Sequence, residues 1–296
     1  MDLTSFLQYA RYVRESCSIR IGRHQNVIDI GSGHAPLIRA DVLCDLFVRH
    51  STQRPVASAF LVAGRSVVAD VLDLPFHDKA FDFAYSKNLL EHVSDPLRAC
   101  AEISRIADKG LLRLPSRLWE IMGGARPHLW LISQEGDTLA FERKTGAHTA
   151  LNSQIPARVR NSVHYERMFQ RFPDLFYVTH WWKHTIRAQT VFSSEETDYY
   201  HFDDETEYLS TNAEDIGRAV NRARSLPRLA RFFLYEAIRR LMGGRNIDLF
   251  SLLACPACKG NFAEIGHDML SCGTCKLAFP ILNGIPILTK QSGVRM

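Results

Sequence analysis

The sequence lacks an apolar run of the ~18 residues that a helix needs to cross a bilayer. Residues 1–17 have mixed polarity and lack the apolar core of a signal peptide. Neither sign of charge is in large excess, because 36 Lys and Arg face 32 Asp and Glu, a formal net charge of +4. These absences argue against a membrane-spanning protein and against a chain whose overall charge demands a polyanionic partner. They predict a soluble, cytoplasmic protein.

The composition is that of a globular protein. The chain has 296 residues, of which 46% are hydrophobic and 23% are charged, which argues against a mostly disordered or fibrous protein. No internal repeat is visible. A length near 300 residues is typical of one large domain or two.

Short apolar runs alternate with helical patterns in the first part of the chain, which indicates a parallel α/β sheet. A helix is expected over residues 4–20, and another begins at Asp95 and Pro96, residue types that favour a helix start. Residues 117–175 are expected to form an irregular insertion, and residues 175–182 and 186–192 an antiparallel hairpin that closes the sheet. The remaining strands are expected just before Gly31 and at residues 40–46, 66–69, 81–85 and 110–114.

A glycine bend, Gly31-Ser32-Gly33, follows the first expected strand. Such a bend lets a nucleotide-type ligand approach the backbone, and both NAD-binding domains and methyltransferases that use S-adenosylmethionine have one. The NAD version needs a third glycine where this chain has Pro36, and an acid ~20 residues further on. NAD binding is therefore disfavoured.

Three acids lie at or near the ends of strands that point to one crevice. Asp29 precedes the bend, Asp45 ends the second expected strand, and Asp70 ends the third. Ligands bind at the carboxyl ends of strands in such sheets. Carboxylates there can accept hydrogen bonds from ribose hydroxyls and from an adenine amino group. Asp45 and Asp70 are, however, each also compatible with an ordinary turn.

Residues 27–33, 69–82 and 89–97 resemble class I S-adenosylmethionine-dependent methyltransferases, most closely the branch that acts on small molecules such as quinone precursors. The resemblance implies a Rossmann-like, seven-stranded sheet with an antiparallel last strand. Because residues 34–40 are too short for the usual first helix, Asp41 is an alternative to Asp45. The resemblance assigns S-adenosylmethionine to Asp29, Gly31, Ser32 and Gly33 at the methionine end, Asp45 at the ribose, Asp70 and Val71 at the adenine, and Ser86 beside the sulfonium.

The reaction itself needs no metal, since the sulfonium methyl is already electrophilic and the protein supplies orientation. A hydroxyl acceptor would also need a general base. His128, in the insertion, and His92, in the Leu-Glu-His-Val motif, are the candidates, each with a purely structural role as its alternative. The expected fourth strand is not followed by an Asn/Asp-Pro-Pro-aromatic motif or a Pro-Cys pair, which argues against amide, adenine-amine or pyrimidine-carbon methylation.

Four cysteines near the end of the chain form two Cys-x-x-Cys pairs separated by thirteen residues: Cys255, Cys258, Cys272 and Cys275. This spacing predicts a structural, closed Zn²⁺ site in a small module. Residues 248–290 resemble the zinc-ribbon activator subunit shared by several tRNA, rRNA and release-factor methyltransferases. That resemblance implies a ribbon that packs on the sheet of its own methyltransferase domain.

The connecting segment separates its charges. Residues 195–207 hold seven acids and no Lys or Arg, whereas residues 216–245 hold eight arginines and one acid, Glu236. The arginines are expected to pair with the acidic run, with RNA or anionic-lipid binding as alternatives. The expected organisation is a methyltransferase domain over residues 1–194, a helical linker over 195–246 and a zinc-ribbon domain over 247–296.

The sequence therefore predicts a methyltransferase with a built-in zinc ribbon. The expected acceptor is an oxygen or nitrogen of a small molecule, a glycan or a lipid precursor. One alternative, suggested by the ribbon and the arginines, is methylation of RNA or of a translation protein. The other is a scaffold that binds the cofactor without turnover.

Overall fold

The computed structural model describes residues 12–48, 61–123, 127–145, 171–191, 226–265 and 268–296, with residues 148, 159, 162, 164, 167 and 168. Residues 12–18 are helical, which agrees with the helix expected over residues 4–20. The acidic run and residues 216–225 lie outside the described residues. No helix in the described part is long and apolar enough to cross a membrane.

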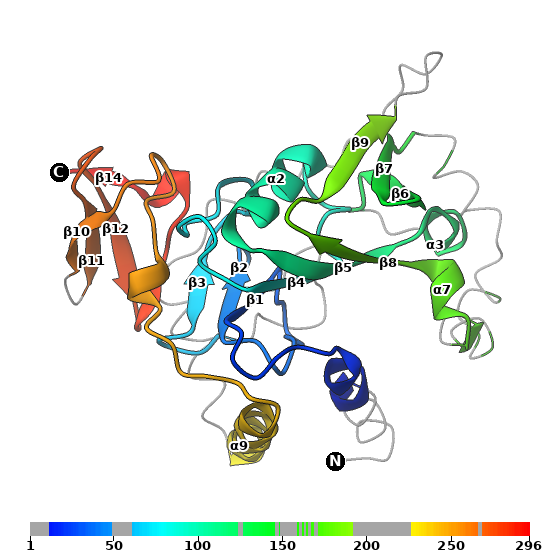
Figure 1. The fold of residues 1–296 in the computed structure, drawn as a ribbon, viewed down its shortest axis with the longest axis horizontal. Helices are drawn as coiled ribbons and strands as arrows, with labels where there is room; N and C mark the ends of the chain where they lie inside the picture. The colour runs from blue at the N-terminus through cyan, green and yellow to red at the C-terminus, as the bar shows by residue number, and fades with distance from the viewer. Residues whose placement is uncertain are drawn as a thin grey trace.

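The central sheet of the described residues has the strand order β3-β2-β1-β4-β5-β8 (Figure 1). All pairs are parallel except β5 with β8, which is antiparallel. Strand β1 is buried along its whole length, as expected for a parallel strand covered on both faces. The bounds are β1 Val27–Ile30, β2 Val42–Asp45, β3 Ser66–Val68, β4 Phe83–Lys87, β5 Lys109–Pro115 and β8 Tyr177–Lys183.

The mixed α/β fold and the antiparallel last strand agree with the sequence prediction, but the described sheet has six strands rather than seven. The expected hairpin of residues 175–192 is wrong in its second half. Strand β9 (Arg187–Val191) leaves β8 and pairs in parallel with β7 (Thr138–Arg143). The backbone N–H of His184 donates to Asp108 O at 2.7 Å and that of Ile186 to Ser104 Oγ at 2.9 Å, which directs the chain toward helix α2 (Pro96–Ile106).

Helix α2 (Pro96–Ile106) begins as the sequence predicts. The Asp95 carboxylate accepts from Arg98 N at 3.0 Å, and Pro96 lies in the first turn. The helix buries Ala99, Cys100 and Ile103 in the main core.

The insertion is more regular than expected. Strands β6 (Trp130–Glu135) and β7 (Thr138–Arg143) form a hairpin, whose turn contains Gly136 at φ +60°, a conformation that favours glycine. With β9 they form a second, three-stranded sheet. Short helices α3 (Arg117–Met122) and α7 (Pro173–Phe176) flank this region.

The C-terminal module extends the edge of the central sheet. The backbone of Ile287 bridges Val68 of β3 in parallel, and Leu288 N donates to Val68 O at 2.8 Å. On a second side, Leu253 bridges Phe76, and both are buried in the core shared with the central sheet. The module therefore packs on its own methyltransferase-like domain, as the sequence predicts, and Figure 1 shows it beside β3.

The module's strands are ordered β10-β11-β12-β13, with β14 paired to β12. Their bounds are β10 Phe262–Ile265, β11 Met269–Cys272, β12 Leu277–Leu282, β13 Ile285–Pro286 and β14 Val294–Arg295. Single 3-10 turns occur in the sheet domain at η1 (Val71–Asp73) and in the module at η2 (Phe250–Leu252) and η3 (Lys290–Ser292).

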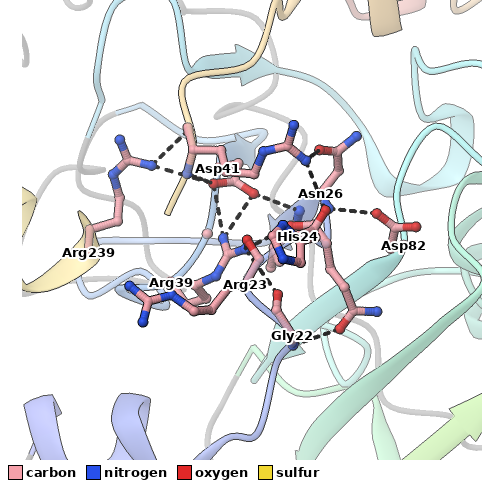
Figure 2. A network of polar contacts seen from close by, with 12 residues as sticks. Gly22, Arg23, His24, Asn26, Arg39, Asp41, Asp82 and Arg239 are labelled. Atoms are coloured by element: carbon pink, nitrogen blue, oxygen red, sulfur yellow. Dashed lines mark hydrogen bonds and ion pairs between the residues drawn. The ribbon is translucent and has the colours of Figure 1, made fainter. Parts of the chain in front are cut away.

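Helix α9 (Leu226–Leu241) carries the described part of the arginine-rich segment. Arg239 is fully buried and lies 3.5 Å from Asp41 Oδ1, and Arg245 N donates to the same oxygen. Figure 2 shows Asp41 joined to Arg39 and Arg239 in one polar network. Arg239 pairs with Asp41 and Glu236, whereas the acidic run of residues 195–207, which the sequence suggests as a partner of the arginines, lies outside the described residues.

Candidate active site

A cleft of about 470 Å³ opens at the carboxyl ends of β1, β2 and β4. This volume lies within the ~300–1,000 Å³ usual for small-ligand sites. The cleft brings together all but one of the residues expected from the sequence to bind the cofactor or act in catalysis: Asp29, Gly31, Ser32, Gly33, Asp45, Asp70, Val71, His92 and His128.

The glycine bend has the backbone that glycine permits. Gly31 and Gly33 have φ of +71° and +56°, and the amide of Gly31 donates to Cys44 O on β2. A Cβ on Gly31 would lie 3.1 Å from Leu89, so a larger residue would press on the motif after β4.

Asp29 holds the loop after the bend. Its carboxylate is buried and accepts from Leu37 N at 2.6 Å. Burial raises the pKa of Asp29 from 3.8 to about 7, although the bond from Leu37 N opposes this shift. This bond closes a loop that contains no helix, as the shortness of residues 34–40 had suggested.

Asp45 and Asp70 occupy the ends of neighbouring strands. Asp45 accepts from Gly33 N at 2.7 Å and from Phe47 N at 2.8 Å, so it fixes the bend from β2. Asp70 accepts from Leu72 N at 2.9 Å, and burial raises its pKa. Asp41, the alternative to Asp45, lies at the other end of β2 in the buried network with Arg39 and does not line the cleft.

The two serines differ in position. Ser32 lines the cleft, and its buried Oγ has no hydrogen-bond partner among the described residues. Ser86 is fully buried within β4 and does not line the cleft. Its neighbours Tyr85 and Lys87 do line the cleft, because successive side chains of a strand point to opposite faces.

The two candidate bases lie side by side and share a buried carboxylate. The rings of His92 and His128 are perpendicular, with centroids 4.5 Å apart. Each Nε2 lies 4.0 Å from Glu91 Oε1. Burial, with His128 nearby, lowers the pKa of His92 to about 3, whereas burial raises the pKa of Glu91 to about 7.

A second carboxylate orients His128. Glu120 Oε1 forms a short hydrogen bond with His128 Nδ1, and Lys144 Nζ donates to Glu120 Oε2 at 3.1 Å. The indole of Trp119 stacks on the His128 ring at a centroid distance of 5.4 Å. Sequence reasoning missed Glu91, Glu120 and Lys144. The position of Glu91 next to His92 in the chain was a local signal. The contacts of Glu120 with His128 and of Lys144 with Glu120 depend on tertiary structure.

The four cysteines converge within the C-terminal module. Their sulfur atoms lie within 4.8 Å of one another, with Cys255 and Cys275 3.6 Å apart and Cys258 and Cys272 3.5 Å apart. Four thiolates about 2.3 Å from one ion would have similar separations. The cysteine pairs lie in matching turns, each followed by a lysine at positive φ.

Comparisons with known families agree with this arrangement. Residues 29–112 match the family described as a methyltransferase domain, and residues 246–284 match the family described as Trm112p-like protein. The chain contains a methyltransferase domain and a C-terminal Trm112-like domain. The first match contains most of the cleft's strand ends, and the second contains all four cysteines.

Two curated relatives match only the Trm112-like domain. A UPF0434 protein of Magnetococcus marinus is 37% identical over 50 residues, which are 17% of this chain and 85% of that protein. A UPF0434 protein of Dechloromonas aromatica is 49% identical over 44 residues, 14% of this chain and 76% of that protein.

Solved structures match the methyltransferase at low identity. One is a Thermotoga maritima S-adenosylmethionine-dependent methyltransferase, 16% identical with a TM-score of 0.27, covering 39% of this chain and 59% of that one. The chain thus spans less than two thirds of that protein. Another is the Haloferax volcanii complex between the Trm112 methyltransferase activator and a methyltransferase, 15% identical with a TM-score of 0.33, covering 58% and 88%.

Proposed function

We propose that this methyltransferase transfers the methyl group of S-adenosylmethionine to an RNA or a protein. The observation that carries this proposal is the Trm112-like domain, which extends the methyltransferase sheet at β3 through Ile287 and Val68. A ribbon of this kind resembles the activator of tRNA, rRNA and release-factor methyltransferases. The small-molecule, glycan or lipid-precursor acceptor expected from the sequence has less support.

The cleft has hydrogen-bonding groups and a volume that suit S-adenosylmethionine. The orphaned Ser32 Oγ and the acids Asp45 and Asp70 offer polar partners around a cavity of about 470 Å³. When bound, S-adenosylmethionine supplies an electrophilic methyl group. We assign Asp29, Gly31, Ser32 and Gly33 to its methionine end, Asp45 to the ribose, and Asp70 with Val71 to the adenine. We assign Ser86 no direct contact with the cofactor, since its side chain is buried within β4 away from the cleft.

The protein's contribution to the reaction is orientation. We assign the strand ends to the cofactor and the other lining residues, among them Trp119 and His128, to the acceptor. Alignment of reacting groups can contribute several of the ~7–11 kcal/mol available from positioning. General-base roles for His128 and His92 stay predictions.

Any RNA contact must use groups other than Arg239 and Arg245, whose side chains are already engaged within the protein. Arg239 and Arg245 are bound to Asp41, Glu236 and nearby carbonyl groups. Arg240, by contrast, is exposed on α9. We therefore assign Arg239 and Arg245 to anchoring the linker rather than to binding phosphate.

The test of the acceptor is transfer of labelled methyl from S-adenosylmethionine, with the full chain, into separated RNA, protein and small-molecule fractions of a cell extract. Label in RNA or protein is expected. Label confined to small molecules would contradict the proposed acceptor class. Calorimetry tests the cofactor separately, and absence of S-adenosylmethionine binding would support the scaffold alternative.

The cofactor assignment is tested by Asp70→Ala, which removes an acceptor near the adenine position. It should weaken binding about tenfold or more, as expected for loss of a hydrogen bond to a charged group. Asp78→Ala is the matched control, because this exposed acid lies outside the cleft. Equal affinities for both variants would refute the role of Asp70.

We also propose that the four cysteines hold a structural Zn²⁺ ion. A four-thiolate site is closed and serves stability rather than catalysis. Elemental analysis of the full chain should give one Zn²⁺ per molecule, and Cys272→Ser should lose it and lower the melting temperature. A full chain that keeps its stability after complete chelation would contradict this assignment.

A further inference from the structure

A second group of metal-type ligands lies in the wall of the cleft. Glu91, His92 and His128 each offer one ligand atom, and these three atoms lie within 4.8 Å of one another. The cluster is separate from the four cysteines. Both histidines line the cleft, so the cluster is reached from the proposed acceptor side.

Both imidazoles are held with Nε2 turned toward the same carboxylate. His128 Nδ1 bonds to Glu120, and His92 Nδ1 lies 3.3 Å from Pro127 O. Because both Nδ1 partners are acceptors, they favour a proton on Nδ1, which leaves the Nε2 lone pair available. Metal-binding histidines are oriented by carboxylates and backbone carbonyls in this way.

Glu91 supplies the independent indication of a missing cation. Its side chain is fully buried, and neither carboxylate oxygen has a hydrogen-bond partner among the described residues. A buried carboxylate without a partner is costly, whereas a bound cation would neutralise it. The two N···O distances of 4.0 Å are too long for hydrogen bonds but leave space for an ion between the groups.

The surrounding backbone places the ligands before any ion binds. Leu129 N donates to Glu91 O at 2.7 Å, which ties the segment after β4 to the segment that carries His128. The stacked Trp119 ring restricts His128 further. An ion about 2.0–2.2 Å from each ligand would draw the three groups slightly closer.

We propose that Glu91, His92 and His128 bind a divalent transition-metal ion at the wall of the methyl-transfer cleft. Two imidazoles and one carboxylate suit Mn²⁺, Fe²⁺, Co²⁺ or Zn²⁺ and leave coordination positions open. An open position facing the cleft can bind an oxygen of the acceptor and lower its pKa. This last role rests on the proposed function, but the binding of the ion does not.

The proposal is tested with Mn²⁺ and the full chain loaded with a single equivalent of Zn²⁺, which the four thiolates should take first, by electron paramagnetic resonance of the remaining free Mn²⁺. Zn²⁺ binds a given site more tightly than Mn²⁺, and thiolates favour Zn²⁺, so the cysteine site should stay closed to the probe. One Mn²⁺ per chain is expected to bind. Glu91→Gln, which keeps the size of the side chain, should weaken binding more than tenfold.

Glu120→Gln provides a second reading, because Glu120 contacts His128 and is not proposed as a ligand. It should weaken Mn²⁺ binding by about 10–100-fold, as loss of a residue that orients a ligand does. It also keeps the test valid if Glu91→Gln fails to fold. His180→Gln, at a buried histidine of β8 outside the cluster, is the matched control and should bind like the wild type.

If the wild type binds Mn²⁺ no more tightly than the His92→Gln variant does, the proposal is overturned. Equal binding by wild type and by both glutamate variants would overturn it as well. These results are independent of S-adenosylmethionine binding and of methyl transfer. Failure of the metal site and failure of the proposed function are therefore distinguishable.

Discussion

Asp41 and Glu91 are both fully buried carboxylates, yet their surroundings are opposite. Asp41 accepts from Val27 N and from Arg39 at 3.0 Å, and it also contacts Arg239 and Arg245 N. Glu91 has no hydrogen-bond partner for either oxygen among the described residues. The first lies at the amino end of β2, and the second lies by the cleft at the other end of the sheet.

This difference separates a group that stabilises the fold from one that is kept for a ligand. A buried charge is tolerated when it is paired and hydrogen-bonded, as Asp41 is. An unpartnered buried charge lowers stability and is found mostly where function needs it. The two ends of one sheet thus show both situations.

The largest effect is expected for Asp41→Asn. The substitution removes the carboxylate that pairs with the buried Arg39 and one of the two that pair with the buried Arg239, which should lower the free energy of unfolding by about 3–5 kcal/mol. Urea denaturation of the full chain measures it. Asp137→Asn, at an exposed acid, should stay within about 0.5 kcal/mol of the wild type. Similar losses for the two variants would remove the distinction drawn for Asp41.

Asp29 lies between these extremes, because it is buried and accepts one hydrogen bond, from Leu37 N, among the residues that the structure describes. Its pKa of about 7 exceeds the unfolded value of 3.8, so the folded state binds the proton more tightly. The carboxyl should therefore reduce stability by roughly 2–4 kcal/mol as pH rises from 4 to 7. Asp29→Asn should flatten the curve of unfolding free energy against pH over this range. An unchanged slope would contradict the raised pKa.

The smallest effect, and the opposite sign, is expected for Glu91→Gln in the metal-free protein. An amide of the same shape replaces a buried charge without partners, so stability should rise by about 1–3 kcal/mol at pH 8. Thermal unfolding after chelation, compared with the Zn²⁺-loaded protein, measures the change. A loss as large as that of Asp41→Asn would show that Glu91 stabilises the fold.

Much of the central sheet follows from local sequence. The strand ends that carry Asp45 and Asp70 and the start of α2 at Asp95 depend on residues adjacent in the chain. The four cysteines likewise converge as their spacing predicts, since two short knuckles need few distant contacts.

The rest depends on contacts between distant segments. Strand β9 leaves β8 because Ile186 N finds Ser104 Oγ, a partner that no local pattern reveals. The cleft wall is similar, since Glu120 and His128 meet through the fold around α3. Ser86 does not line the cleft for a smaller reason, because a shift of one residue along a strand turns a side chain from the cleft into the core.

The backbone bridge between Ile287 and Val68 has a consequence for assembly. A separate activator would leave its enzyme on dilution, whereas this one is tethered and its encounter with β3 is intramolecular. The edge of the sheet is therefore capped at any protein concentration. A strand of a neighbouring copy of the chain therefore has no free edge at β3 with which to pair.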